Sequence, residues 1–377
     1  MQTLDPVAAA THADPYPCYA RLREGPPLVW DERLSVWIAS RSDVIESLLK
    51  KPDALRVRPV AEPVPREIAG TPAGEVFGHL VRMNDGAAHT AHRPPLQRAL
   101  AGLDLHAVQA DASRIARGVV DMPLSDALFE MPVRSVAHLL GFADAILPEV
   151  AQWLRAFVAC LSPLSNESQL QIASEAAAAL MARLERLVHS AAPRRASILA
   201  AVQTETACID APASRALLAN LVGLLSQTCD ATAGLLGNSL VALGREPVGQ
   251  EPLGAVVGEV ARHDPSVQNT RRFVAAAVTV AGVSLAPGDA VLLVLAAANR
   301  DPALNPEPDR FRVQRENRRS LGFGHGVHAC PGEALACTLA TAALGVLLNA
   351  RPGLPAAIAS RGWRYRPSVN ARIPEFQ

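Results

Sequence analysis

The stretch RSLGFGHGVHACPGEALA, residues 319–336, constrains this chain more than any other. Gly322, Gly324 and Gly326 alternate with larger residues shortly before Cys330, and a helical pattern follows from about residue 332 to 350. Glycine lets a backbone turn where a side chain would block it. The loop can therefore pass close to a large flat group, and Cys330 would face that group from a fixed place.

The chemistry of Cys330 has three interpretations. A sulfur at the start of a helix is stabilised as a thiolate by the helix dipole and by free backbone N–H groups, and a thiolate is a strong ligand for iron. A buried cysteine can also serve as a small hydrophobic residue. A glycine-rich loop before a helix can hold a phosphate, but the Lys-Ser/Thr pair of a P-loop is missing here.

Composition excludes several classes of protein. The 377 residues include 36 basic and 36 acidic side chains, so no basic excess is available for binding nucleic acid. No signal peptide and no uncharged apolar stretch of membrane-spanning length is recognised, so no membrane association is expected. The six cysteines form no CxxC pair, which indicates a reduced, cytoplasmic protein.

The hydrophobic pattern predicts a mainly α chain, because aromatic residues make up only 4% and helical periodicity dominates residues 89–220. The longest helix is predicted over 211–243. Residues 27–40 predict two short strands, 41–51 a helix, 278–299 a strand–turn–strand unit and the tail after 350 a strand. With no repeats and no linker, one domain over 1–377 is expected.

The spacing of Phe323, Gly326, Cys330 and Gly332 resembles the haem-binding loop of the cytochrome P450 family. In that family the cysteine thiolate is the axial ligand of haem iron. The resemblance implies the cytochrome P450 fold, a single large helical domain with small β-sheets. It also implies haem b as cofactor and Cys330 as the metal ligand.

A second element of the resemblance lies in GEVARHDP, where Glu259 and Arg262 share a helix face. Taken alone, such a pair is an ordinary surface ion pair of little energetic value. In the family a buried Glu-x-x-Arg pair joins an arginine that precedes the cysteine loop, and Arg310 in PEPDRF matches it. The resemblance gives all three residues a structural role in bracing the loop.

Four basic residues match positions that bind the haem propionates in the family. Each alone is more often a solvated side chain, but four matches favour the haem interpretation. They are His89, Arg93, Arg272 and His328. Pro94 and Pro95 follow directly and predict that the helix carrying His89 and Arg93 is cut short or kinked.

The central helix, NLVGLLSQTCDATAGLLGNSLVAL over 220–243, departs from the family pattern Ala/Gly-Gly-x-Asp/Glu-Thr. Asp230 aligns with the acid and is the candidate proton-relay residue. Ala231 replaces the usual threonine, and Gln227 and Thr228 replace the small pair. Thr232 carries a hydroxyl, but it lies about 100° further round the helix and is expected to point away.

Asn220, Leu224, Gln227, Thr228 and Ala231 follow one helical stripe, which predicts a pocket wall. Gln227 and Thr228 either only shape the helix through hydrogen bonds or project over the haem and order a water or a polar substrate group. The missing threonine suits a substrate-assisted proton relay, oxidative coupling or desaturation without hydroxylation, or peroxide-driven oxidation.

The polar run Gln268, Asn269 and Thr270 matches another part of the family's pocket, where it would bind a polar substrate; pairing with backbone is the alternative. The short segment 57–84 indicates an open pocket or a substrate presented on a carrier protein.

No GxGxxG follows a strand, so a separate ferredoxin or flavodoxin is expected to supply electrons. Its docking surface is predicted to comprise Arg98, Arg315, Arg318 and Arg319. The alternative is that these arginines are only a solvated run of charges. Together these features predict a monomeric haem-thiolate monooxygenase that oxidises a small molecule, plausibly in bacterial secondary metabolism, with dioxygen and two electrons. A haem sensor or binding protein without turnover is the alternative from another class.

Overall fold

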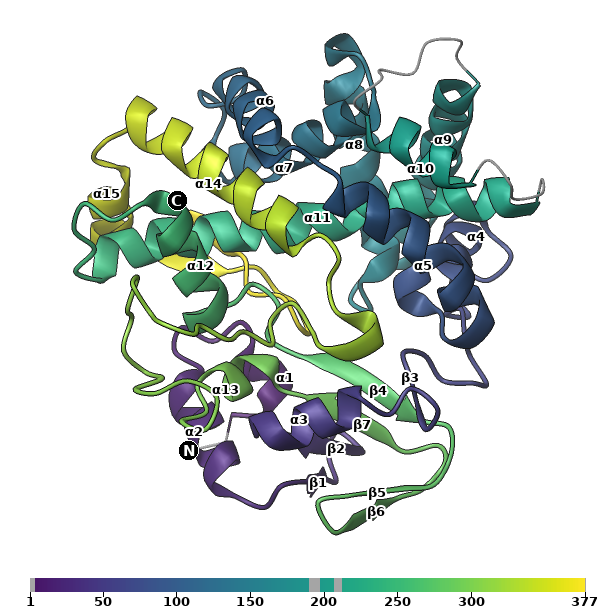
Figure 1. Cartoon of the computed structure of the whole chain (residues 1–377), viewed down its shortest axis with the longest axis vertical. Helices are drawn as coiled ribbons and strands as arrows, with labels where there is room; N and C mark the ends of the chain where they lie inside the picture. Colours follow the sequence, from purple (N-terminus) through teal and green to yellow (C-terminus); the bar gives the residue numbers. More distant parts are fainter. Residues whose placement is uncertain (1–3, 190–196, 207–211, 377) are drawn as a thin grey trace.

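The computed structural model describes residues 4–189, 197–206 and 212–376. Its central element is α11 (Pro212–Arg245), which crosses the helical half of the molecule (Figure 1) and contacts α4, α7, α12, α14 and α15. Leu221, Leu225 and Leu236 are fully buried along it. A helix that is apolar on most of its faces is stable only when other helices surround it, which explains this central position.

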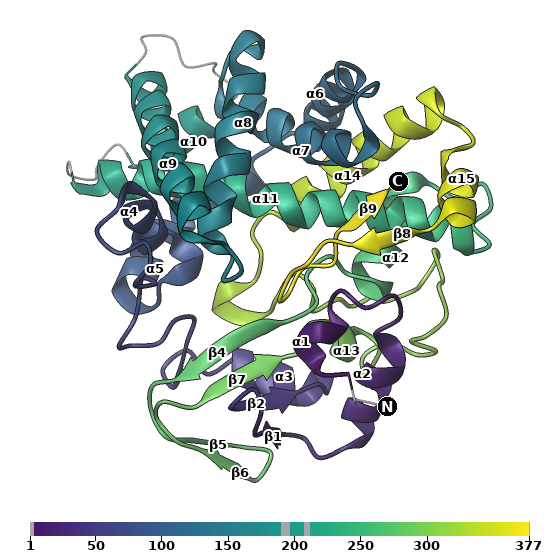
Figure 2. The same ribbon diagram turned by 180° about the vertical axis from the view of Figure 1, so that it is seen from behind.

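The remaining helices enclose α11 or cover the sheet (Figures 1 and 2). The α-helices are α1 (Pro6–Ala9), α2 (Tyr16–Glu24), α3 (Ser42–Leu49), α4 (Pro72–His79), α5 (Gly86–Ala101), α6 (Leu105–Arg117), α7 (Leu124–Leu140), α8 (Leu147–Phe157), α9 (Glu167–Val188), α10 (Ile198–Thr206), α12 (Leu253–His263), α13 (Leu295–Asn299), α14 (Glu333–Ala350) and α15 (Leu354–Arg361). The short 3-10 helices are η1 (Val81–Met83), η2 (Asp144–Ile146), η3 (Val158–Leu161) and η4 (Gly326–His328).

The β structure lies mainly at the opposite end from the helical half (Figure 2). One five-stranded sheet has the order β1-β2-β7-β4-β3, with β2 and β7 parallel and the other pairs antiparallel. Its strands are β1 (Val29–Asp31), β2 (Val36–Ala39), β3 (Leu55–Arg56), β4 (Thr270–Val274) and β7 (Ala290–Leu293). Two further antiparallel sheets have two strands each: one pairs β5 (Val278–Val280) with β6 (Val283–Leu285), and the other pairs β8 (Trp363–Tyr365) with β9 (Pro374–Phe376). β4 carries Arg272 to the edge of the cavity described below.

Most of the predicted elements are confirmed. The strands within 27–40, the helix within 41–51, the last long helix and the long central helix are present, although residue 211 lies outside the described part. Within 278–299 the sheet strand β7 and the short helix α13 follow the predicted hairpin. The tail prediction missed α15, which precedes β8.

The first alternative predicted for Pro94 and Pro95, a helix cut short, is wrong, because α5 continues through both residues. Two prolines remove two backbone donors and crowd the preceding turn. Leu96, Ala99 and Leu100, which follow them, are buried in the core. Their burial offsets the lost backbone hydrogen bonds, so packing overrides the local preference.

Among the described residues, segment 326–350 has the length and apolar composition of a membrane-spanning helix. Core helices pass the same test. α14 packs against α6, α7, α11 and α12, so these helices cover much of its apolar surface.

Candidate functional site

A cavity of about 890 Å³ lies between the cysteine loop, α11, β4 and the segment from η1 to α5. The loop contributes Gly322, Phe323, Gly324, His328, Cys330, Pro331 and Gly332 to its wall. From α11 come Asn220, Leu224, Gln227, Thr228, Ala231, Thr232 and Leu235. The structure thus brings two separately predicted motifs to the wall of one cavity.

The cysteine loop depends on glycine at two positions. Gly324 and Gly326 have φ angles of +76° and +70°, which disfavour any residue with a side chain. A Cβ atom on Gly326 would lie 2.6 Å from the carbonyl oxygen of Leu49, so α3 approaches the loop too closely for a side chain. The Cys330 N–H donates to the Phe323 carbonyl at 2.7 Å and closes the loop below the sulfur.

Four effects act on the pKa of the Cys330 thiol. Burial, the largest, raises this pKa, and a hydrogen bond from the backbone N–H of Gly332, just before α14, opposes the rise. The charge of Glu333 adds to the rise, and that of Arg93 opposes it. The stabilisation that the sequence predicts is therefore present but smaller than the cost of burying a negative charge. A positive charge against the sulfur would favour the thiolate.

The four basic residues predicted to bind propionates gather on one side of this cavity. Arg93, Arg272 and His328 line it, and the rings of His89 and His328 lie 4.3 Å apart. Nε2 of His328 lies 2.9 Å from Oδ1 of Asp85, a partner that sequence analysis missed. Asp85 and His328 are 243 positions apart, and only the fold relates them.

Several donors of this cluster lack an anionic partner among the described residues. Nε2 of His89 is buried without any hydrogen-bond partner. Burial, together with the positive charges of His328 and Arg93, lowers the pKa of His89 to about 4, so the ring is neutral near pH 7. Arg272 donates only to Thr270 Oγ1 and to a backbone carbonyl. This donor set fits the carboxylates of a bound haem.

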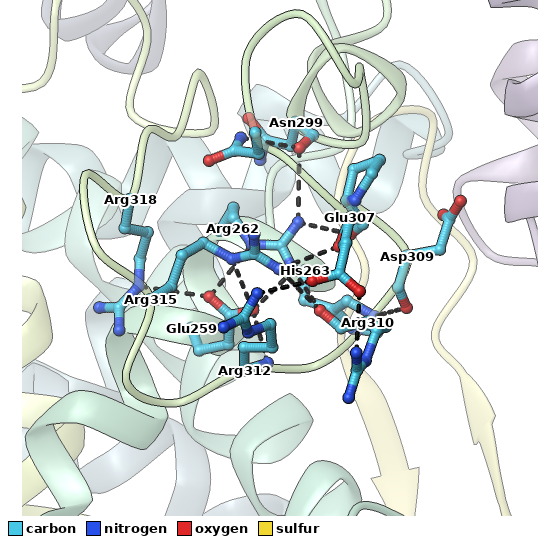
Figure 3. A network of polar contacts seen from close by, with 12 residues as sticks. Glu259, Arg262, His263, Asn299, Glu307, Asp309, Arg310, Arg312, Arg315 and Arg318 are labelled. Atoms are coloured by element: carbon cyan, nitrogen blue, oxygen red, sulfur yellow. Dashed lines mark hydrogen bonds and ion pairs between the residues drawn. The ribbon is translucent and has the colours of Figure 1, made fainter.

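Figure 3 shows the polar network behind the cysteine loop. Glu259 and Arg262 are both fully buried, and their closest oxygen–nitrogen distance is 2.6 Å. Arg262 also donates to the Pro308 carbonyl at 2.7 Å, and the Arg312 N–H donates to Glu259 at 3.0 Å. A buried carboxylate is stable only with such partners, so the segment before the loop is held against α12.

The role predicted for Arg310 is wrong. Its side chain is 71% exposed and pairs with Glu307, and only its carbonyl accepts from Arg262 and Arg315. Arg315 supplies the third charge instead: it is 4% exposed and lies 3.4 Å from Glu259. The path of the loop brings Arg315 to the buried carboxylate of Glu259. Residue spacing alone does not identify this arginine.

The same network corrects the predicted electron-donor surface. Arg315 is buried against Glu259, and Arg318, whose Nε lies 3.3 Å from Glu259, also donates to the Val313 carbonyl. Arg319 is exposed but pairs with Glu46, and Arg98 is exposed. Arg315 and Arg318 therefore brace the loop and are not available to a docking protein.

On α11, Gln227 and Thr228 line the cavity, but each hydrogen-bonds to the helix itself. Gln227 Nε2 donates to the Gly223 carbonyl at 2.9 Å, and Thr228 Oγ1 donates to the Leu224 carbonyl at 2.7 Å. These bonds match the helix-shaping alternative. Asn220 accepts from the Val81 N–H at 2.7 Å, so it ties α11 to η1.

Thr232 was expected to point away, and this is wrong. The residue lines the cavity, and its Oγ1 is buried without a hydrogen-bond partner among the described residues. The cavity wraps around this turn of α11, so the successive positions Ala231 and Thr232 both reach it. Asp230 does not belong to the described lining; its Oδ2 lies 2.7 Å from a guanidinium nitrogen of Arg366.

The polar run after α12 divides between core and cavity. Asn269 and Thr270 line the cavity, and Asn269 donates to the Val369 carbonyl at 3.0 Å. Gln268 does not line it, contrary to prediction: it is fully buried, accepts from the Tyr19 hydroxyl at 3.1 Å and donates to the Pro265 carbonyl. The bonds of Gln268 and Asn269 to backbone carbonyls match the alternative of pairing with backbone, and those of Gln268 hold its side chain in the core.

Comparisons with known proteins agree with this geometry. The family model described as Cytochrome P450 matches residues 252–350. The chain is 29% identical to cytochrome P450 monooxygenase PikC of Streptomyces venezuelae over 91% of this chain and 85% of that protein. The structure of CalO2 is similar with a TM-score of 0.79 and 25% identity, covering 98% of this chain and 96% of that one. The structure of P450BioI in complex with an acyl carrier protein ligated to hexadec-9Z-enoic acid has a TM-score of 0.78 and 21% identity, covering 96% and 97%.

Proposed function

We propose, on the premise that this chain belongs to the cytochrome P450 family of monooxygenases, that it oxidises a small organic molecule in a tailoring or biosynthetic step of secondary metabolism. The observation that carries the proposal is the position of Cys330. Cys330 lies on the wall of a large cavity that the polar stripe of α11 also lines. In this proposal a single domain spans residues 1–377 and acts in the cytoplasm as a monomer.

Haem b is the proposed cofactor, and the sulfur of Cys330 would hold its iron. Bound haem would supply the iron that activates dioxygen. His89, Arg93, Arg272 and His328 would hold the propionates, with neutral His89 donating from the nitrogen that lacks a partner. Phe323, Gly326 and Gly332 would shape the loop that presents Cys330 to the haem.

Proton supply to the site is proposed to depend on Asp230 and on a second polar group. Ala231 has no hydroxyl, so this group comes from elsewhere. The first candidate is a hydroxyl or amine of the substrate, since Ala231 leaves space on the cavity wall. The second is Thr232, whose hydroxyl is buried and unpaired among the described residues. Oxidative coupling, desaturation and peroxide-driven oxidation are the alternative chemistries.

Electrons are proposed to come from a separate ferredoxin or flavodoxin. With Arg315 and Arg318 held by Glu259, exposed Arg98 and Arg319 remain as the candidate contacts for an acidic donor. The complex of P450BioI with an acyl carrier protein supports presentation of the substrate on a carrier as a further option for this chain.

The test is spectroscopic. The purified holoprotein, reduced in the presence of carbon monoxide, is expected to show the red-shifted band of a haem ligated by a thiolate, and Cys330→His should abolish that band while haem stays bound. A wild-type protein that binds haem without this band would overturn the proposal. A wild-type protein that shows the band but accepts electrons from no ferredoxin or flavodoxin would favour the haem sensor.

A further inference from the structure

Arg82, in η1, lines the cavity and is only partly exposed. Its Nε is buried without a partner, and no residue that the structure describes forms a hydrogen bond or ion pair with its guanidinium. Arginine stays protonated at any working pH. A buried charge without a partner is costly, so a guanidinium in this position indicates that an anion arrives from outside the chain.

The surroundings of Arg82 provide no negative charge. The titratable groups that act on it are the thiols of Cys229 and Cys160. Burial raises the pKa of Cys160 to about 12 and that of Cys229 well above its ordinary value, so both thiols stay neutral near pH 7. Arg82 therefore keeps its full charge on the cavity wall.

Arg82 is also separate from the basic cluster near the cysteine loop. The charged groups that act on His89 and Arg93 include His328, Asp85 and Cys330, and Arg82 is not among them. The sulfur groups beside Arg82 come from α11 and η3 instead. An anion bound at Arg82 would thus occupy a different part of the cavity from the haem carboxylates.

The backbone that carries Arg82 is fixed on both sides. The Val81 N–H donates to Asn220 on α11 at 2.7 Å, and Asn220 donates to the His79 carbonyl at 2.9 Å. On the other side, Asn84 donates to the carbonyls of Gly78 and Leu80, each at 2.8 Å. A cation held on a braced segment needs little reorganisation when a ligand binds.

We propose that Arg82 binds the carboxylate of the substrate, so that this protein oxidises a free organic acid. The inference rests on the proposed function and names the substrate class of the same cavity. A guanidinium and a carboxylate match in charge and can form two parallel hydrogen bonds. A phosphate dianion would require a second unpaired cation nearby.

Arg58, another arginine of the cavity wall, does not supply that second charge. Arg58 lines the cavity, but Glu62 and Glu67 act on it as counter-charges, and it donates to the Glu62 carbonyl at 3.1 Å. Of Arg58 and Arg82, only Arg82 lacks a carboxylate that acts on it among the described residues, and this one charge favours a monoanion. A carrier-bound substrate has its carboxyl group converted to a thioester, so this assignment favours the free acid over carrier presentation.

The test is a titration of the ferric holoprotein with decanoate, 3-phenylpropanoate and their methyl esters, read as the haem spin-state shift. Wild type is expected to bind at least one acid about 10- to 100-fold more tightly than its ester, as for a hydrogen bond between charged groups. Arg82→Gln should remove this preference and leave ester binding unchanged, and Arg82→Lys should restore part of it. Arg66→Gln is the matched control, because Arg66 is 86% exposed and pairs with Glu62.

Three results would overturn the inference. The first is that wild type binds the acids no better than the esters. The second is that the preference for the acids survives in Arg82→Gln. The third is thermal: ligand-free Arg82→Gln is expected to melt at or above the wild-type temperature, and a clear decrease would reveal an internal partner for the guanidinium. Failure of the proposed function is distinguishable, since it appears as a missing thiolate–carbon monoxide band in wild type.

Discussion

Arg366 and Asp230 form an ion pair of 2.7 Å that joins the C-terminal segment after β8 to α11, one residue before Ala231. Both side chains are about one-third exposed, at 38% and 35%. The other carboxylate oxygen, Oδ1, is buried without a partner among the described residues. The acid thus reaches solvent on one side and the interior on the other, which suits the transfer of protons between them.

Asp230→Asn is expected to lower the rate of coupled turnover by about 100-fold, a magnitude typical of losing a proton-transfer group. Arg366→Gln keeps the carboxylate and should therefore have a much smaller effect. The measurement is product formed per NADPH consumed, with a surrogate ferredoxin and reductase and the tightest-binding substrate. Equal losses in both variants would show that the pair is structural, and a larger solvent isotope effect in Asp230→Asn alone would support proton transfer.

Two threonines on neighbouring turns of α11 provide a matched comparison. The Thr228 hydroxyl donates to the Leu224 carbonyl, whereas the Thr232 hydroxyl is buried and unpaired among the described residues. Thr232→Val is expected to increase peroxide release relative to product several-fold, and Thr228→Val to change it little. If both variants behave as wild type, while Ala231→Thr also leaves peroxide release unchanged, the substrate itself supplies the hydroxyl.

Replacing Arg310 and Arg315 one at a time tests which of the two arginines belongs to the Glu259 network. The sequence pattern predicts Arg310, and the structure places Arg315 there. Arg315→Met removes a partner of a buried carboxylate and should lower the free energy of unfolding by about 3 kcal/mol and weaken haem retention. Arg310→Met alters an exposed pair and should stay within about 0.5 kcal/mol of wild type. Urea unfolding of the holoprotein measures both, and the reverse ranking would restore Arg310 to the network.

The comparison of Arg310 with Arg315 also shows what the sequence predicts. Features encoded by short spacings were visible: the glycine loop around Cys330, and the pair Glu259 and Arg262 on one helix turn. The path of an irregular loop decides which arginine reaches a buried carboxylate, and no local pattern records that path. Arg82 is a stronger case, because its burial depends on contacts of η1 with α11 that are distant in sequence.

Gln268 illustrates a different limit. Its position in a polar run indicated a pocket wall, with pairing to backbone as the alternative, and its side chain is buried between the Tyr19 hydroxyl and the Pro265 carbonyl. The neighbours Asn269 and Thr270 both reach the cavity, so a simple alternation of faces does not predict which of the three residues turns inward. Sequence analysis therefore located the segment correctly but assigned one of its three residues to the wrong side.

His263, at the end of α12, makes the stability of the protein depend on pH. Nδ1 of its ring lies 3.0 Å from a guanidinium nitrogen of Arg300, and Nε2 lies 3.0 Å from the Asp309 carbonyl. Burial, followed by the positive charge of Arg300, lowers the pKa of His263 to about 3. The folded protein holds the ring neutral, with Nε2–H donating and Nδ1 accepting.

Below the ordinary histidine pKa of about 6.5, the unfolded chain therefore binds a proton at His263 that the folded chain does not. The contribution of neutral His263 to the free energy of unfolding is fully present above pH 6.5 and is lost as the pH falls toward 3. Between pH 7 and pH 5 the loss should be about 2 kcal/mol. His263→Gln keeps one acceptor and one donor without the titration, so its stability should fall by that much less over the same interval. Urea unfolding of both proteins at the two pH values measures the difference, and parallel losses would mean that His263 is protonated in the folded state.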